Sequence, residues 1–229
     1  YRQMVGISSP GDTTVVTNKW MLGTRNSFII GICATFLATA LGTVAALGLS
    51  RPNMPFKGTI MAILISPMIV PLIITSAGMF FFYSKIGLTH TYLGLILAHT
   101  ALGTPFVVIT VTATLTGFDT NLIRASQSLG ADTMRTFFKV IMPLILPGVI
   151  SGALFAFITS FDEVVVVMFV GSVEQITIPK QMWAGLRQET SPVILCMATC
   201  LVFLSIALLT TVELLRRRSE RLRGIKLRN

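Results

Sequence analysis

The chain has 229 residues, of which 53% are hydrophobic and only 12% are charged, and its mean hydropathy is +0.79. This composition excludes an ordinary soluble domain and is typical of an integral membrane protein. The formal net charge of +9 does not indicate nucleic-acid binding, because the basic residues lie between and after apolar runs and form no stripe.

Apolar runs predict the membrane spans, since a spanning helix needs roughly 20 apolar residues. Five segments meet this requirement, so we predict an all-α integral membrane protein built as a polytopic helical bundle. The predicted spans are 26–50, 59–83, 91–116, 148–170 and 192–215.

The distribution of Lys and Arg predicts the orientation, because cytoplasmic segments are enriched in basic residues. Most of the 18 Lys and Arg residues fall on one side if 117–147 is a cytoplasmic loop and 216–229 a basic cytoplasmic tail. Residues 26–215 are then the transmembrane domain, and 1–25 an extracytoplasmic segment. The opening residues read like the middle of a loop, so we expect a further N-terminal span, a sixth, to be missing from this sequence.

Small residues recur at every fourth position in the first and fourth predicted spans. Such rows let helix backbones approach closely, which is how membrane helices associate without help from water. The rows are Ala34, Ala38, Gly42 and Ala46, and Gly148, Gly152, Ala156 and Ser160.

Three prolines lie inside spans, Pro67 and Pro71 in the second and Pro105 in the third. Each removes a helical N–H and frees a carbonyl, so we expect these helices to bend. His99, in the third span, is expected to be an interhelical hydrogen-bond partner. The three cysteines have no metal-like spacing and are expected to be small buried residues.

The segment after the third span is polar and basic, unlike the runs on either side. Asp119 can cap a helix over 120–129, Gly130 can supply a left-handed stop, and Asp132 can cap a second helix that ends near Pro143. The predicted result is a helix, a sharp bend and a helix, with apolar side chains that need a partner surface.

Two acidic residues, Asp162 and Glu163, fall within the fourth predicted span, roughly 21 Å from its cytoplasmic end at about 1.5 Å per residue. Charges at such depth are costly unless they are paired or face water, so they are candidates for a solute pathway. Phe157 and Phe161, one turn apart, could offer aromatic faces to an ammonium group. A cationic, amine-bearing solute fits these residues. The alternative is that one carboxylate pairs with a neighbouring helix and holds the bundle together.

The stretch around Trp183 is expected to be a short helix lying along the outer surface.

The polar segment and its surroundings resemble a known family. Gly130, nine residues and then "VIMP", ending at Pro143, are similar to the cytoplasmic EAA loop of permease subunits in bacterial binding-protein-dependent ABC importers. Ala125 matches that pattern, whereas Arg124 stands where the family has Glu and Ser126 where it has the second Ala. The stretches "GTPFVVITV", "SFDEVVVVMF" and "TSPVILCMATCLV" extend the resemblance over nearly the whole chain, and look most like the second permease of spermidine/putrescine-type importers.

This resemblance implies a pathway-forming permease subunit of type I importer fold in the bacterial inner membrane, which imports a polyamine such as putrescine or spermidine. It implies a second permease, a dimer of cytoplasmic ATPase subunits and an extracytoplasmic solute-binding protein as partners. The loop 117–147 would be the coupling loop that contacts the ATPase, with Arg124, Ala125, Ser126, Gly130, Ala131 and Pro143 as its motif residues.

The chain itself has no G-x-x-x-x-G-K-[ST] phosphate loop, so ATP is expected to bind to the partner subunit, and no catalytic or metal site is expected. Other solutes remain open, namely an opine, an amino acid derivative, a phosphonate or ferric iron. An ion-coupled secondary carrier is a rival from another class, since it also uses carboxylates in broken helices. An integral membrane enzyme is a third, which the lone acidic pair supports poorly.

Overall fold

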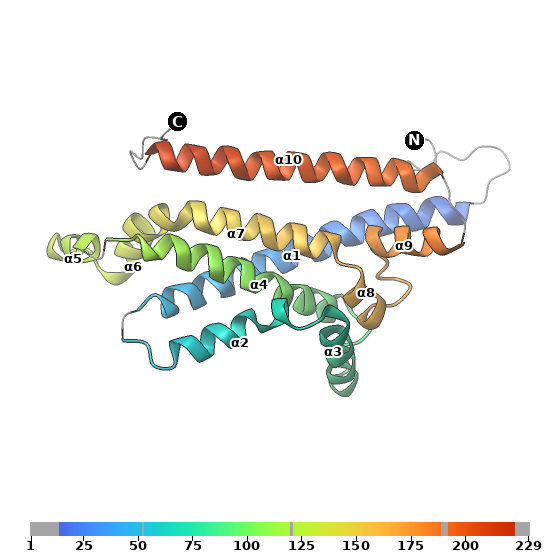
Figure 1. Ribbon diagram of the computed structural model, residues 1–229, viewed down its shortest axis with the longest axis horizontal. Helices are drawn as coiled ribbons and strands as arrows, with labels where there is room; N and C mark the ends of the chain where they lie inside the picture. Colours follow the sequence, from blue (N-terminus) through green and yellow to red (C-terminus); the bar gives the residue numbers. More distant parts are fainter. Residues whose placement is uncertain (1–13, 52, 120, 189–191, 223–229) are drawn as a thin grey trace.

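The computed structural model describes residues 14–51, 53–119, 121–188 and 192–222, and within these ranges it is helical without a β-strand (Figure 1). A π-helix, Phe137–Ile141, joins α6 to α7. The α-helices are α1 Thr14–Leu49, α2 Lys57–Ile69, α3 Leu72–Ile86, α4 Tyr92–Thr116, α5 Asn121–Ser128, α6 Thr133–Thr136, α7 Met142–Asp162, α8 Val165–Val170, α9 Ile178–Gln188 and α10 Pro192–Leu222.

The centre of the bundle consists of α1, α4 and α7, which pack most extensively against one another. The short helices α5 and α6 lie at one end of the long axis, and α8 and α9 lie at the other, while α10 runs beside α7 (Figure 1). The two polar or broken parts of the chain are therefore at opposite ends of the same three-helix core.

The rows of small residues are the contact faces of this core, as predicted. Ala38 and Ala156 are fully or almost fully buried, and a Cβ added at Gly103 of α4 would lie 3.0 Å from the Ala156 Cβ and 3.4 Å from the Ala38 Cβ. A Cβ at Gly152 would lie 2.8 Å from the Cα of Val107. The three backbones approach so closely because these positions carry no larger side chain.

The second predicted span is sharply bent at Pro71, as predicted there, whereas α2 continues through Pro67. The two halves of the span, α2 and α3, meet at 103°, and the chain is extended at Val70 and Pro71. Pro71 has no N–H to donate to α2, so it cannot continue that helix. Its fixed φ is suited to the start of α3. In contrast, α4 continues through Pro105 as one helix of 25 residues.

Among the described residues, three helices are long and apolar enough to cross a membrane, or four if the bent α2–α3 pair is one span. In α10 the described apolar run is Ile194–Ala207, which is shorter than a full span. The helix α1 begins at Thr14, inside the segment expected to be extracytoplasmic, and residues 1–13 and 223–229 lie outside the described ranges.

Two predicted boundaries in the fourth span are wrong. No helix ends near Pro143, because the chain is continuously helical from Thr133 to Asp162. The π-helix explains this, since the wider turn, in which the Met142 N–H donates to the Phe137 carbonyl, accommodates the proline ring that follows. The helix then ends at Asp162 rather than running to residue 170, because Glu163 is extended with φ −73° and ψ 127°.

The cysteine prediction is also wrong in part. Cys33 on α1 and Cys200 on α10 are exposed on the helix surfaces rather than buried. A thiol is apolar enough to face lipid without a partner.

Candidate translocation site and coupling loop

The segment 117–147, predicted to couple to an ATPase and named the coupling loop here for that reason, has the predicted helix, bend and helix, and the predicted residues form its caps. The Asn121 N–H donates to Asp119 Oδ1 over 2.9 Å, and the Arg135 N–H donates to Asp132 Oδ1 over 2.7 Å. Gly130 has φ +81°, in the left-handed region that glycine adopts most easily. Local side-chain chemistry therefore fixes where each short helix begins and where the chain turns.

A pair of hydroxyl groups joins the two sides of this bend. Ser126 Oγ and Thr136 Oγ1 lie 2.9 Å apart, and Thr136 is only 2% exposed. The Ser126 hydroxyl also donates to the Ile123 carbonyl over 2.9 Å. The hydroxyl pair fixes the angle between α5 and the helix that continues into α7.

The outer surface of the coupling loop is apolar at several points. Leu129 is 89% exposed, and Met134 and Phe138 are also exposed. Of the motif residues, Arg124, Ala125 and Gly130 are exposed and Ala131 is half-buried; the exposed Pro143 lies beyond the π-helix at the start of α7. Exposed apolar side chains on a polar segment are the features expected of a surface that docks onto another protein.

The two acidic residues lie at a helix break, not within a continuous span, and their surroundings differ. Asp162 is the last residue of α7 and is exposed. Glu163 is 7% exposed, and its Oε1 accepts a hydrogen bond from the Val166 N–H over 2.9 Å. The carboxylate of Asp162 is therefore exposed on this chain, whereas that of Glu163 accepts a hydrogen bond from the first turn of α8.

The two aromatic residues lie together, as their spacing predicts. The rings of Phe157 and Phe161 stack with centroids 5.3 Å apart, and Phe161 meets the ring of Phe28 edge-on at 5.2 Å. Phe161 is buried in a cluster with Trp20 and Ile178, so its ring serves the core. Phe157 is half-buried and so more exposed than Phe161.

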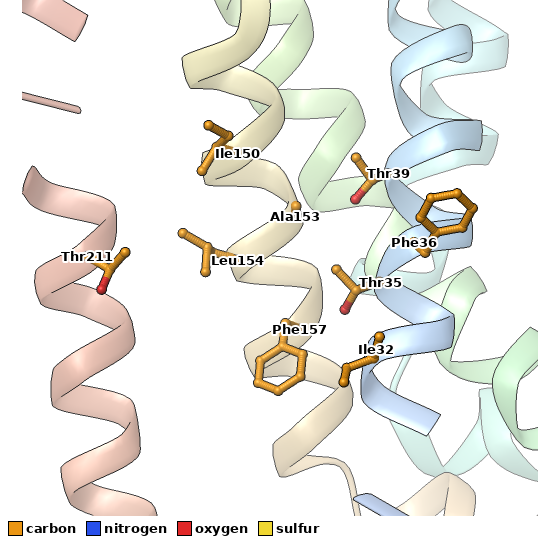
Figure 2. Close-up of a pocket in the computed structure, with 9 residues that line it drawn as sticks. All are labelled: Ile32, Thr35, Phe36, Thr39, Ile150, Ala153, Leu154, Phe157 and Thr211. Carbon is orange, nitrogen blue, oxygen red and sulfur yellow. The ribbon is translucent and has the colours of Figure 1, made fainter. Parts of the chain in front are cut away.

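Phe157 lines a cavity of about 590 Å³ between α1, α7 and α10, shown in Figure 2. Among the described lining residues, the polar ones are three threonines, Thr35 and Thr39 on α1 and Thr211 on α10, and neither Asp162 nor Glu163 lines the cavity. Among the described residues that line it, none is charged. The structure thus separates the aromatic and acidic residues that the sequence grouped together.

His99 forms the interhelical hydrogen bond that was predicted. Its Nδ1 lies 2.8 Å from Ser160 Oγ, and both residues are buried. The contact joins α4 to α7 two residues before Asp162, so it supports the end of α7.

The segment between α8 and α9 is tied to several helices. The Asn26 side chain on α1 donates to the carbonyls of Glu174 and Ile176 over 2.8 and 2.9 Å. Lys180 Nζ on α9 donates to the carbonyls of Val167 and Ser172 over 3.1 and 3.2 Å. Burial lowers the pKa of Lys180 below its ordinary value, and these two carbonyl oxygens offset part of the desolvation of its ammonium.

With this geometry established, comparison with known proteins decides the family. The profile of the family described as "Binding-protein-dependent transport system inner membrane component" matches residues 38–222. The chain belongs to this family. It is therefore a multi-pass membrane permease, and its long apolar helices agree with that membership.

Curated relatives of the permease cover most of its length. It is 31% identical over 195 residues to the spermidine/putrescine transport system permease protein PotC of Haemophilus influenzae, across 85% of this chain and 76% of that one. It is 28% identical over 218 residues to PotC of Escherichia coli K12, across 93% and 83% of the two chains.

Solved structures support the fold of the permease. A chain of the MetNI methionine ABC transporter, in an inward-facing crystal form, superposes with a TM-score of 0.63 at 22% identity, over 90% of this permease and 95% of that chain. The type I importer permease fold expected from the sequence is thus confirmed.

Two residues that hold these segments of the permease in place were not predicted from the sequence. Thr136 pairs with Ser126 across the bend at Gly130. The predicted helix, bend and helix was the signal that side chains on its two sides would be in contact. In the sequence, Lys180 stands out only as one of the basic residues outside the predicted cytoplasmic segments. Its contacts with Val167 of α8 and with Ser172, just beyond α8, join positions 13 and 8 residues apart, beyond the reach of local sequence patterns.

Proposed function

We propose that this permease forms the translocation pathway of an ATP-driven importer for a polyamine such as putrescine or spermidine. The observation that carries the proposal is the 31% identity over 195 residues with a spermidine/putrescine permease. The putrescine transport permease PotI of Escherichia coli K12, 30% identical over 186 residues, supports the same class of solute.

The chemistry of Asp162 supports a cationic solute. An exposed carboxylate at the end of a membrane helix attracts an amine, and the attraction strengthens where the pathway excludes water. Polyamines carry several ammonium groups, so one such carboxylate is a useful contact point along their route.

The partners we propose are a second permease, a dimer of ATPase subunits and an extracytoplasmic solute-binding protein, assembled in the bacterial inner membrane. ATP binds to the ATPase subunits, and this chain holds no cofactor. Exposed Leu129, Met134 and Phe138 on the coupling loop supply an apolar surface for the ATPase. The charge of Arg124, where the family has Glu, favours an acidic group on the ATPase opposite α5.

The proposal is tested by uptake into proteoliposomes that contain the purified complex. Labelled putrescine and spermidine are offered together with the solute-binding protein, with ATP or a non-hydrolysable analogue inside the compartment that holds the ATPase. We expect polyamine uptake only with hydrolysable ATP. Opines, phosphonates and ferric iron serve as competitors, and an imposed proton or sodium gradient replaces ATP in a separate arm.

Two results would contradict the proposal. Uptake that is blocked by an opine, a phosphonate or iron, but not by unlabelled polyamines, would assign a different solute. Uptake driven by the ion gradient without ATP would make the protein a secondary carrier.

A further inference from the structure

The short helix α8 needs outside support. It has six residues, Val165–Val170, which is well below the length at which an isolated helix is stable. The first N–H groups and last carbonyls of any helix also lack partners within it, so a helix this short consists mostly of unsatisfied ends.

Glu163 provides partners at the start of α8. Its Oε1 accepts from the Val166 N–H over 2.9 Å, and the side chain is 7% exposed. The negative charge also lies at the positive end of the helix dipole, which favours the helical conformation.

Lys180 adds a charged donor towards the other end. Backbone N–H groups also donate to two carbonyls there, that of Gly171 to Val167 and that of His90 to Val170. Lys180 Nζ donates to the Val167 carbonyl over 3.1 Å and to the Ser172 carbonyl, just beyond the helix, over 3.2 Å. The positive charge lies at the negative end of the dipole. Two charges of opposite sign thus bracket one short helix without contacting each other.

The bracketed helix is packed into the core. Val166, Val167 and Val170 are fully buried, and they pack with Leu95 and Ala98 of α4. The position of α8 therefore determines where the chain must leave α7, and the residue at that point is the exposed Asp162.

We propose that Glu163 and Lys180 are positioning residues, which hold α8 in place and so keep Asp162 directed into the solute pathway. Glu163 is then not itself a contact for the solute. The acidic pair divides into one residue that meets the solute and one that caps a helix. This assignment rests on the proposed transport function, because solute uptake is one of its measurements, but it does not depend on which solute is transported.

Substitutions at Glu163 separate the two roles. Glu163→Gln keeps an oxygen that can accept the Val166 N–H, whereas Glu163→Ala removes it. We expect Glu163→Gln to retain most of the uptake per assembled complex, and Glu163→Ala to lose about fivefold, as for the loss of a helix cap. If Gln and Ala lower uptake equally and both raise the KM for the transported solute, Glu163 is a solute contact and the assignment is overturned.

Substitutions at Lys180 test the other end. Lys180→Met keeps the length of the side chain without its donor, and we expect a similar loss of uptake per assembled complex, with recovery in Lys180→Arg. Lys85→Met, at an exposed lysine at the end of α3, is the matched control and should be neutral. If Lys180→Met lowers only the amount of complex and leaves uptake per complex unchanged, its role is merely structural and the inference fails.

A second readout needs no solute. In full-length permease within its complex, with the native cysteines replaced by alanine, Asp162→Cys is labelled with a membrane-impermeant maleimide. We expect Lys180→Met to change the labelling rate about fivefold and Lys85→Met to leave it unchanged. Equal rates in all three would refute the positioning role. If the complex does not import polyamines, the proposed solute is refuted, but the labelling result is unaffected because the labelling experiment uses no solute.

Discussion

The replacement Gly130→Val tests whether the bend of the coupling loop matters for coupling ATP hydrolysis to transport. Gly130 has φ +81°, and a Cβ built there would meet no atom within 4 Å. Neighbouring atoms therefore add no steric cost, and the whole cost comes from forcing an L side chain into the left-handed region. This cost is about 1–2 kcal/mol.

A cost of this size lowers the population of the native bend relative to other conformations by a factor of about 5–30. Because the bend sets the direction of α5, we expect the complex either to assemble less well or to hydrolyse more ATP for each solute imported. The assay measures ATP hydrolysis and solute uptake in the same proteoliposomes, normalised to the complex recovered.

Two further variants serve as controls for this prediction. Gly130→Asn should stay close to the parent, because asparagine is among the residues that most readily adopt positive φ. Gly117→Val, at an exposed glycine of the same loop with φ −92° and open space around its Cβ position, should also be neutral. Parent-like uptake and ATP consumption in Gly130→Val would refute the reasoning, as would an equal loss in Gly117→Val.

Three more predictions concern packing, orientation and charge. Gly152→Ala should lower the amount of folded permease in membranes, because the added Cβ would lie 2.8 Å from a backbone atom of α4. The control Gly48→Ala, whose Cβ would meet nothing within 4 Å, should not lower it. Equal yields of the two variants would disprove close packing at Gly152. In a cysteine-free background, Val173→Cys in the α8–α9 segment should react with an impermeant thiol reagent from outside the cell, and Gln127→Cys on α5 only from the cytoplasm. Labelling of both cysteines from the same side would contradict the predicted topology. Asp162→Asn should leave assembly intact while uptake of putrescine falls about tenfold or more, a change of about 1.4 kcal/mol; parent-like uptake would remove this residue from the pathway.

Features of the fold that depend on local chemistry were predictable from the sequence. Asp119 and Asp132 cap helices because a short carboxylate reaches the nearby free N–H groups, and Gly130 turns the chain because it has no Cβ. The rows of small residues predicted the packing faces of α1 and α7, since close approach of two helices needs small side chains on the same face, but they did not predict that α4 is the helix packed against both.

Hydropathy could not predict the break after Asp162. The apolar run continues through the valines of α8, so a hydropathy profile shows one uninterrupted span. What ends α7 is the backbone at Glu163 and its hydrogen bond to Val166, which depend on conformation rather than on apolar content. At Pro143 the sequence predicts a helix end that does not occur, because the rule that proline ends helices does not anticipate a π-helix just before the proline.

The π-helix between α6 and α7 also has a consequence for engineering chimeras. A π-turn holds one residue more than an α-turn, so every side chain after it is rotated by about 100° around the helix axis. A donor loop joined at Thr136 without Phe137–Ile141, or with one residue fewer, would turn Gly148 and Gly152 away from α4. Exchanges of coupling loops between permeases should therefore keep these five residues with the span that follows, because they set the phase of α7.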